Sequence, residues 1–277
     1  MLHIGVIVVL YNKIAYPIDS FRASKNNVHL IIVDNTPNQD LCLNDDFLYY
    51  IPIMQNKGIG FAQNIGIKKA QEIGCDYIVF FDQDSVIPDK YVANIVDLYI
   101  KIKNVYPNLF ILGPTLINGR TSKIYESSLY RYQNDSLGFS CRREIISSGS
   151  CIETALIDIV GPLDETLFID YIDFEWCWRA KSMNFISGIT SEVTLTHFIG
   201  QKEYKYFNQL VIVSSPFRYY FQIRNYIWLC KRRYTPTKWK INTGIRKLLD
   251  LIYLKFKVNN YSDILKNVIH GIHDGLN

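Results

Sequence analysis

Short apolar runs alternate with helix-like segments through the first hundred residues of the chain. The runs are rich in Val, Ile and Phe, as in strands that are covered on both faces. They predict strands at residues 4–10, 28–33, 47–53 and 77–81, and helices at about residues 61–73 and 89–103. Because strands and helices alternate, the pattern predicts an α/β fold with a mostly parallel central sheet.

The second half of the chain has a less regular pattern. Residues 111–116 and 192–196 have the pattern of strands, and residues 174–181 have that of a helix. From about residue 201 onward the period is helical, with one break at Thr235-Pro236. We therefore expect the sheet to be followed by a group of C-terminal helices.

The composition is that of a folded protein without a membrane-spanning segment. The chain has 277 residues, of which 48% are hydrophobic and 20% charged, so it can bury a sizeable core. Its apolar runs are far shorter than the roughly 20 residues that cross a bilayer. The N-terminus has no basic region and no small-residue cleavage site, so no signal peptide is expected. The six cysteines form no C-x-x-C pair, which indicates a cytoplasmic protein with no disulfide framework and no zinc site.

Positive charge is concentrated near the C-terminus. Residues 218–257 hold eleven Lys or Arg and one acid, a net charge of +10, while the rest of the chain carries −6. Together with the change of period, this division predicts a domain over residues 1–200 and a helical, basic and aromatic extension over residues 201–277. Because no nucleic-acid recognition fold accompanies the basic stretch, a nucleic-acid partner is not expected.

The extension also contains an amphipathic helix. Five apolar residues of it fall on one helical face: Ile245, Leu248, Leu249, Ile252 and Phe256. With bases beside this face and aromatic residues interleaved, the extension is expected to associate peripherally with an anionic membrane surface, with its aromatic side chains at headgroup depth. The alternative is that the apolar face packs on the N-terminal domain.

Polar residues follow three of the predicted strands. These are Tyr11-Asn12, Asp34-Asn35 and Asp82-Gln83-Asp84. In parallel sheets ligands bind at the carboxyl ends of the strands, so a site is expected there. Asp82 and Asp84 offer the hard oxygen ligands that Mg²⁺ or Mn²⁺ prefers, although a solvated acidic turn has the same pattern. The Asp34 carboxylate could accept a hydrogen bond from a pyrimidine base or close an Asx turn.

A glycine-containing motif, Asn56-Lys57-Gly58-Ile59-Gly60, precedes the first expected helix. Backbone N–H groups at such a helix start can face an anion. The motif has neither the G-K-[ST] ending of a phosphate-binding loop nor the third glycine of G-x-G-x-x-G, which disfavours a dinucleotide fold. A glycine turn in front of a packed helix is the alternative.

Three acids lie among bulky aromatic residues at positions 170–175. In a helix Glu175 and Arg179 are one turn apart and are expected to pair, which makes Glu175 structural. Asp173 points elsewhere and is the preferred general base, while Asp170 is either a helix N-cap or a second candidate. Trp176 and Trp178 either line an acceptor site or belong to the core. One of the five histidines, His197, ends a strand; it is either an ordinary hydrogen-bonded polar residue or a third metal ligand beside the two acids.

In this order the fragments resemble family 2 glycosyltransferases, which have the GT-A fold, over about residues 4–200. Residues 168–177 and the fragments Arg218-Tyr219-Tyr220 and Arg224-Asn225 resemble the bacterial rhamnosyltransferase branch. The resemblance implies that Asp173 or Asp170 is the base and that Asp82, Asp84 and His197 bind Mg²⁺ or Mn²⁺. It also implies a set of donor-binding residues: Tyr11, Asp34, Asn35, Asn56, Gly58, Asn64, Asp82 and Gln83.

The implied reaction is a single displacement with inversion. A sugar, best guessed as rhamnose from dTDP-rhamnose, would pass to a glycan or lipid-linked saccharide in bacterial surface polysaccharide synthesis, at the inner face of the plasma membrane. The alternatives are an enzyme of the same fold that uses another UDP- or dTDP-sugar, a nucleotidyltransferase, and a non-catalytic membrane-surface binding protein. A nucleotidyltransferase usually has a glycine-rich loop after its first strand, and this chain has none there.

Overall fold

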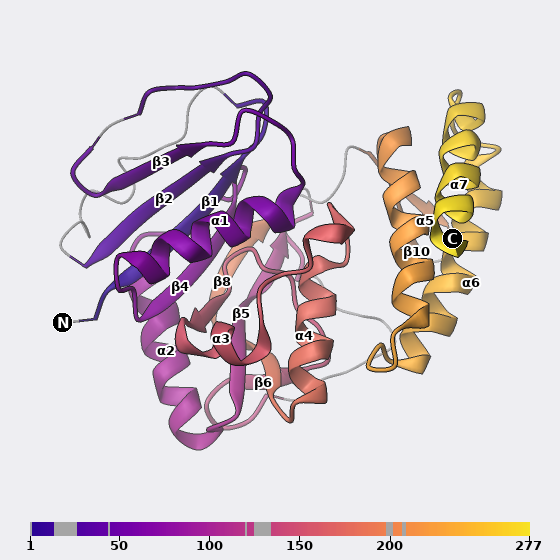
Figure 1. Cartoon of the computed structure of the whole chain (residues 1–277). Coiled ribbons are helices and arrows are strands. Elements are labelled where there is room, and N and C mark those ends of the chain that lie inside the picture. Colours follow the sequence, from indigo (N-terminus) through magenta and orange to yellow (C-terminus); the bar gives the residue numbers. More distant parts are fainter. Residues whose placement is uncertain are drawn as a thin grey trace.

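The computed structural model describes residues 2–13, 27–43, 45–119, 121–124, 134–197, 202–206 and 209–277. Its centre is an eight-stranded sheet in the order β3-β2-β1-β4-β7-β5-β8-β6 (Figure 1). The strands are β1 (Ile4–Leu10), β2 (Val28–Asp34), β3 (Leu48–Pro52), β4 (Tyr77–Asp82), β5 (Leu109–Asn118), β6 (Phe139–Arg142), β7 (Cys151–Glu153) and β8 (Ile186–His197). β3, β2, β1 and β4 are parallel to one another, as are β5 and β8, whereas β7 and β6 run antiparallel to their neighbours.

Helices cover both faces of the sheet. The helices of this part are α1 (Ile59–Glu72), α2 (Tyr91–Val105), α3 (Ala155–Val160) and α4 (Ile172–Ser182), with a short 3₁₀ turn, η2 (Glu165–Leu167). All seven residues of β1 are buried: Ile7 and Val9 belong to the core cluster under α1, α3 and α4, while Val6 and Val8 belong to the cluster under α2. Burial on both faces explains the continuous apolar runs, and it confirms the predicted α/β fold with a mostly parallel sheet.

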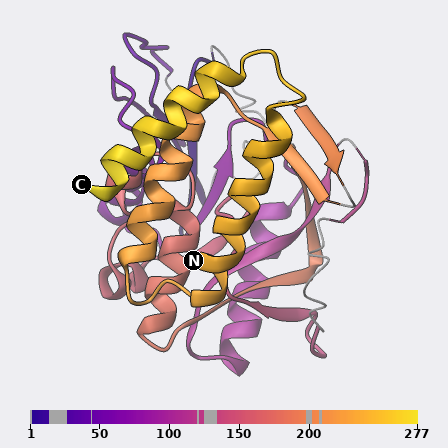
Figure 2. The same cartoon turned by 90° about the vertical axis from the view of Figure 1, so that its right-hand side faces the viewer.

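The C-terminal part begins with an antiparallel hairpin of β9 (Lys202–Tyr206) and β10 (Gln209–Val213). The prediction of helix from residue 201 is therefore wrong for residues 202–206 and 209–213, which form a two-stranded hairpin in front of the first helix. Three helices follow, α5 (Pro216–Lys231), α6 (Thr237–Leu254) and α7 (Tyr261–Leu276), and α5 and α7 lie side by side (Figures 1 and 2). Among the residues described, no helix is long and apolar enough to cross a membrane.

The C-terminal helices share a core with the sheet domain. Leu229 of α5 and Trp239 of α6 belong to the same buried cluster as Trp176 and Trp178 of α4, and the rings of Trp178 and Trp239 are 4.7 Å apart. Trp176 and Trp178 are each only 1% exposed. The suggestion that they line an acceptor site is therefore wrong, and the alternative assignment to the core is confirmed.

Candidate active site

The turns that follow β1, β2 and β4 are hydrogen-bonded to one another at the carboxyl edge of the sheet. The backbone N–H of Tyr11 donates to Oε1 of Gln83 (2.8 Å), and Nζ of Lys13 donates to the backbone carbonyl of Gln83. The N–H of Asn12 donates to Oγ1 of Thr36 (2.8 Å). The structure thus brings Tyr11 and Gln83 together, with the Gln83 side chain bridging β4 to β1.

The Asp34 carboxylate lies beneath this edge and is fully buried. It accepts hydrogen bonds from the N–H of Thr36 (3.0 Å), Nε2 of Gln39 (2.8 Å) and the hydroxyl of Tyr50 (2.7 Å). The first of these bonds is the Asx turn expected as one alternative. Burial, together with the Asp34 carboxylate, raises the pKa of Tyr50 to about 12, so the phenol stays a donor at neutral pH. Because Asp34 is fully buried, a nucleotide base could reach it only if neighbouring groups moved.

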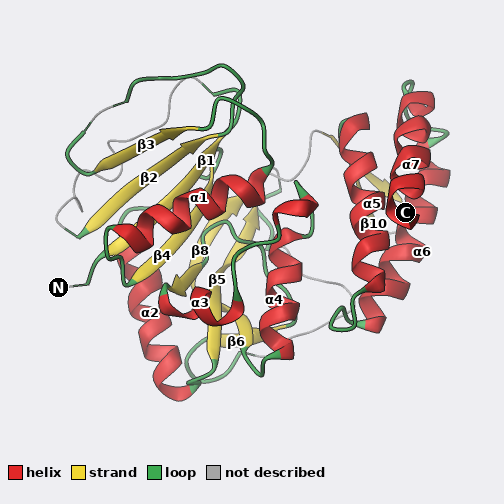
Figure 3. Ribbon diagram, in the orientation of Figure 1, coloured by secondary structure: helices red, strands yellow, loops and turns green. Residues whose placement is uncertain are grey.

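Asn35 and Asn56 connect the end of β2 to the glycine motif before α1. Nδ2 of Asn35 donates to Oδ1 of Asn56 (2.9 Å), which also accepts from the N–H of Gly58 (3.1 Å). Gly58 has a φ of +90°, and a Cβ at this position would lie 2.5 Å from the carbonyl oxygen of Phe168. Only glycine allows this approach. The loop from β3 to α1, which carries the motif, runs along the sheet edge where the parallel strands end (Figure 3).

Asn64 lies inside α1 and contacts a different part of the chain. Its amide donates to the carbonyl of Leu163 (2.9 Å) and to Oε1 of Glu165 (2.8 Å), and it accepts from the N–H of Leu163 (3.0 Å). The structure therefore places Asn64 against the segment that leads to α4, whereas the other predicted donor-binding residues lie at or next to the strand ends.

Asp82 and Asp84 lie at the turn that ends β4. The N–H of Asp82 donates to Oγ of Ser148 (3.3 Å), and Asp84 is exposed. An antiparallel bridge between Val86 and Thr196 brings the end of β8, and with it the backbone of His197, next to this turn. The His197 side chain lies outside the described part of the structure, within which no three His, Cys, Asp or Glu side chains form a metal-binding group. Two carboxylates and an imidazole are nevertheless a donor set that fits Mg²⁺ or Mn²⁺.

Asp173 lies in the first turn of α4, close to the β4 turn. Burial raises the pKa of its carboxyl group to about 7, and the nearby Asp82 carboxylate acts in the same direction. Hydrogen bonds from the backbone N–H groups of Phe174 (2.9 Å) and Ser147 oppose this shift. A carboxylate that titrates near neutral pH can take a proton from a substrate hydroxyl and release it again, as a general base must.

Asp170 forms an ion pair with the C-terminal part of the chain. Arg218 of α5 donates to it from Nε (2.9 Å) and Nη2 (2.7 Å), and the Asp170 side chain is 12% exposed. The expectation that Asp170 is the N-cap of α4 is wrong. Tyr171 occupies the cap position, and no side chain caps this helix, because Asp170 turns toward Arg218 instead.

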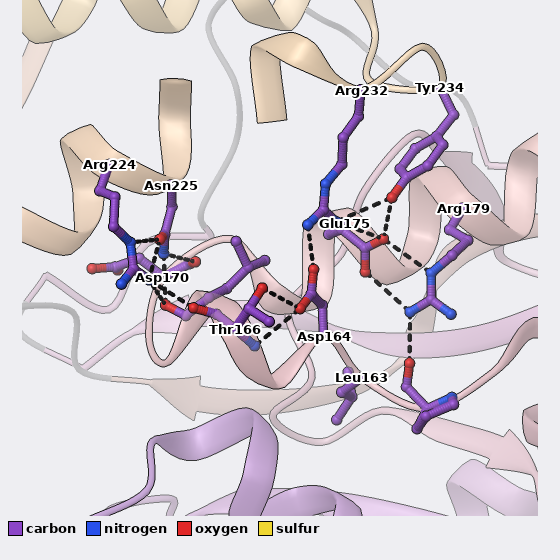
Figure 4. A network of polar contacts seen from close by, with 12 residues as sticks. Leu163, Asp164, Thr166, Asp170, Glu175, Arg179, Arg224, Asn225, Arg232 and Tyr234 are labelled. Atoms are coloured by element: carbon purple, nitrogen blue, oxygen red, sulfur yellow. Dashed lines mark hydrogen bonds and ion pairs between the residues drawn. The ribbon is translucent and has the colours of Figure 1, made fainter. Parts of the chain in front are cut away.

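Glu175 is structural, as its spacing from Arg179 predicted. It is 1% exposed and accepts hydrogen bonds from Nε of Arg179 (2.9 Å) and the hydroxyl of Tyr234 (2.6 Å). Arg232 lies 3.1 Å from it and also pairs with Asp164 (Figure 4). Both C-terminal residues of this network lie between α5 and α6, so the network fastens the C-terminal helices to α4.

Sequence reasoning assigned no role to three residues that contact the segment before α4: Arg218, Arg224 and Asn225. Their partners lie between 48 and 58 positions away along the chain. Only the tyrosine-rich Arg218 and Arg224-Asn225 fragments, quoted for the family resemblance, marked them as unusual.

The polar strand ends, the acidic turn after β4 and the Asp173 carboxylate lie close together at the carboxyl edge of the sheet, where α/β proteins bind their ligands. The sequence profile described as glycosyl transferase family 2 matches residues 5–145, and the chain belongs to this family. It is 28% identical to dTDP-rhamnosyl transferase RfbF of Shigella flexneri, over 99% of this chain and 95% of that protein. It is 24% identical to the low-salt glycan biosynthesis hexosyltransferase Agl10 of Haloferax volcanii, over 60% of this chain and 58% of that protein.

Solved structures show the same fold. TarS of S. aureus, residues 1–349 in complex with UDP, superposes with a TM-score of 0.54 at 16% identity and covers 84% of this chain and 67% of its own. GalNAc-T7 with UDP, GalNAc and Mn²⁺ superposes with a TM-score of 0.55 at 13% identity, over 86% of this chain and 53% of its own. The chain is therefore a glycosyltransferase with the GT-A fold, similar to rhamnosyltransferases.

Proposed function

We propose that the protein transfers rhamnose from dTDP-rhamnose to a saccharide acceptor with inversion, and that Asp173 is the general base. The observation that carries this proposal is the difference in surroundings between the two candidate acids. Asp173 lies near Asp82 with a pKa raised to about 7, whereas Asp170 is bound by Arg218. The choice of donor rests on the likeness to the rhamnosyl transferase of Shigella flexneri, which extends over nearly the full length of both chains.

The chemistry follows from the acids available. An acceptor hydroxyl gives its proton to the Asp173 carboxylate as its oxygen attacks the anomeric carbon, and the nucleoside diphosphate leaves from the opposite face. Retention through a covalent intermediate would need a second, free carboxylate next to the anomeric carbon. Asp170 and Glu175 are both held by arginines, which favours one displacement with inversion.

Asp82, Asp84 and His197 would hold a divalent cation, Mg²⁺ or Mn²⁺. Such a cation supplies Lewis-acid stabilisation of the charge on a leaving diphosphate. The bridge between Val86 and Thr196 supports this assignment because it brings the backbone of His197 to the acidic turn. GalNAc-T7, which shares the fold, was solved with UDP and Mn²⁺, and this supports the proposal of a divalent cation.

The acceptor is proposed to be a glycan or lipid-linked saccharide of bacterial surface polysaccharide synthesis, reached at an anionic lipid surface on the cytoplasmic side. The apolar face of α6 is open to solvent, and its exposed residues are Ile241, Ile245, Leu248, Leu249 and Ile252. Phe256, expected on the same helical face, is exposed in the turn that follows the helix. The exposed bases Lys255 and Lys257 lie at the C-terminal end of this face, which gives it the charge that anionic lipid attracts. The aromatic residues Tyr219, Phe221 and Trp239 are buried, so the expectation that they reach headgroup depth is wrong.

A thermal-shift screen of nucleotide-sugars with Mn²⁺ tests the donor. A ligand at 100 times its dissociation constant adds about 2.7 kcal/mol to the free energy of unfolding. We expect dTDP-rhamnose to raise the melting temperature more than UDP-glucose or UDP-GlcNAc at equal concentration. A larger shift with a UDP-sugar would keep the glycosyltransferase and overturn the choice of rhamnose. Release of pyrophosphate from dTTP and a sugar 1-phosphate would favour the nucleotidyltransferase instead.

A further inference from the structure

The segment between η2 and α4 has an unusual backbone. Phe168, Asp170 and Tyr171 all have left-handed φ angles, of 64°, 68° and 67°. The N–H of Ile169 donates to the carbonyl of Leu167 (2.7 Å), and Phe168 has a ψ of −57°, which makes it the centre of a γ-turn of the rare, strained form. A backbone of this kind persists only where its surroundings hold it, and such strain is concentrated at functional sites.

The start of α1 contacts the γ-turn and forms a hydrogen bond with it. The carbonyl of Phe168 accepts a hydrogen bond from the N–H of Ile59 (2.8 Å). Gly58 lies directly against Phe168, at a distance that no side chain would allow. The glycine motif and the segment before α4 are therefore in direct contact.

Helix α5 also contacts this turn, through the side chain of Asn225. Nδ2 of Asn225 donates to the carbonyls of Leu167 (2.8 Å) and Ile169 (2.7 Å), on both sides of Phe168. Asn225 is fully buried, and its Oδ1 accepts from Nη2 (2.8 Å) and Nε (3.1 Å) of Arg224 (Figure 4).

Arg224 in turn is fixed by its own contacts. Its Nη2 donates to the carbonyl of Thr166 (2.7 Å), and its guanidinium lies 4.1 Å from the ring centroid of Trp228. Arg224 thus fixes the orientation of the Asn225 amide, so that its oxygen faces Arg224 and its nitrogen faces the carbonyls of Leu167 and Ile169.

We propose that Asn225, oriented by Arg224, is a positioning residue for Asp173. By fixing the carbonyls on both sides of Phe168 it fixes the direction in which the chain enters α4, and Asp173 lies two residues after this segment. Helix α5 then supports the active site indirectly, by holding the segment that leads to Asp173. This inference rests on the proposed function, in which Asp173 takes the proton of the acceptor.

An amide is required at this position, because one end of the side chain donates to two carbonyls and the other accepts from Arg224. Asp in place of Asn225 keeps the shape but puts an acceptor oxygen against the carbonyls of Leu167 and Ile169, and Ala removes both bonds. A small displacement of a catalytic group is sufficient to slow a reaction about 100-fold without loss of substrate binding. Asn225→Asp and Asn225→Ala should therefore lower kcat and leave the KM for the donor unchanged.

The test is steady-state transfer by the full-length protein, with Tyr234→Phe as the matched control. Tyr234 also fastens the C-terminal helices to α4, through Glu175, but it does not contact the γ-turn. We expect kcat to fall at least tenfold in both Asn225 variants, with the donor KM within twofold of wild type, and kcat to stay within twofold in Tyr234→Phe. Equal losses of kcat in the control, or a change in the donor KM alone, would overturn the proposal.

Two further outcomes are decisive. If the wild-type protein transfers no sugar, the proposed function fails, whereas normal wild-type transfer with fully active Asn225 variants removes only the positioning role. If the Asn225 variants do not fold, Phe168→Gly replaces them, because glycine adopts a φ of 64° without strain and the variant should fold. Its looser turn should lower kcat at least threefold, and an unchanged kcat would overturn the proposal.

Discussion

Arg218 binds the carboxylate of Asp170 through two of its guanidinium nitrogens, at 2.9 and 2.7 Å. Both oxygens of the Asp170 carboxylate therefore have a partner on α5. The pair therefore separates the roles of two acids that lie three positions apart. Asp170 connects α5 to the segment before α4, and Asp173 is the proposed base.

Replacement of Asp173 by Asn is expected to abolish transfer and to leave donor binding nearly intact. Asn keeps the shape of the side chain and loses its basicity, and a general base contributes about 10²- to 10⁴-fold to the rate. Transfer rates and calorimetric titration with a nucleoside diphosphate measure the two effects separately. Asp170→Asn is the matched control, for which we expect less than a tenfold loss. The reverse order of effects would assign the base to Asp170.

The same substitution is expected to stabilise the protein at high pH. Aspartate in an unfolded chain titrates near about 4, whereas burial and the neighbouring Asp82 raise the pKa of Asp173 in the folded state to about 7. Between these pH values the folded state keeps a proton that the unfolded state releases, so the wild type loses stability as the pH rises through this range. Asn does not titrate.

Urea denaturation with EDTA should therefore show Asp173→Asn to be more stable than wild type at pH 8, by on the order of 3 kcal/mol. At pH 4 the two proteins should differ little. An equal difference at both pH values would show that Asp173 has an ordinary pKa in the folded protein.

Asp84→Ala is expected to remove the dependence of donor binding on Mn²⁺ while the fold survives, because Asp84 lies on the surface of the turn after β4. Calorimetric titration of dTDP with and without Mn²⁺ measures this. Asp89→Ala removes another exposed carboxylate from the same loop and should bind like wild type. Unchanged affinity of the Asp84 variant in the presence of Mn²⁺ would count against the proposed metal site.

Glu175→Gln is expected to destabilise the protein by about 3 kcal/mol, since it removes the buried carboxylate that two partly buried arginines share. Glu175 is 1% exposed and contacts Arg179, Arg232 and Tyr234. Chemical denaturation gives the free energy of unfolding. Glu72→Gln breaks an exposed pair with Lys69 and should change it by less than about 0.5 kcal/mol. Similar small effects in both variants would show that the network of Figure 4 contributes little to stability.

The double variant Leu248→Gln and Phe256→Gln is expected to lose binding to vesicles that contain anionic lipid. Leu248 on α6 is 61% exposed, and Phe256 in the turn that follows α6 is 75% exposed. Co-sedimentation at low salt measures binding, and Ile159→Gln, which changes a 59% exposed residue of α3, is the control. Wild-type protein that stays in the supernatant would reject the membrane role, and a concentration-dependent dimer that the double variant abolishes would assign the face to a second copy.

Local pattern was sufficient for most of the sheet but not for its short strands. The predicted strand at residues 4–10 agrees with β1, because all of its residues are buried and apolar. β7 has three residues and β6 four, too few to produce a period, and both were missed. The predicted strand at residues 192–196 is only the end of β8, whose first half, from Ile186, contains Ser and Gly.

In the candidate site, too, local contacts could be predicted from the sequence and long-range contacts could not. Helical geometry was sufficient to separate Asp173 from Glu175, because the pairing of Glu175 with Arg179 is local. The ion pair of Asp170 with Arg218 and the bonds of Asn225 join residues more than 45 positions apart. Contacts of this kind depend on how the C-terminal helices pack on the sheet domain, and neither period nor composition contains that information.

The most direct test of the central claim is release of dTDP from dTDP-rhamnose by wild type and Asp173→Asn, in parallel, with Mn²⁺ and a saccharide acceptor. We expect acceptor-dependent release by the wild type and a loss of at least 100-fold in the variant, with dTDP-rhamnose binding retained. Release at equal rates by the two proteins would contradict the assignment of Asp173 as the base. Absence of release from every nucleotide-sugar supplied with the wild type would contradict the proposed transfer itself.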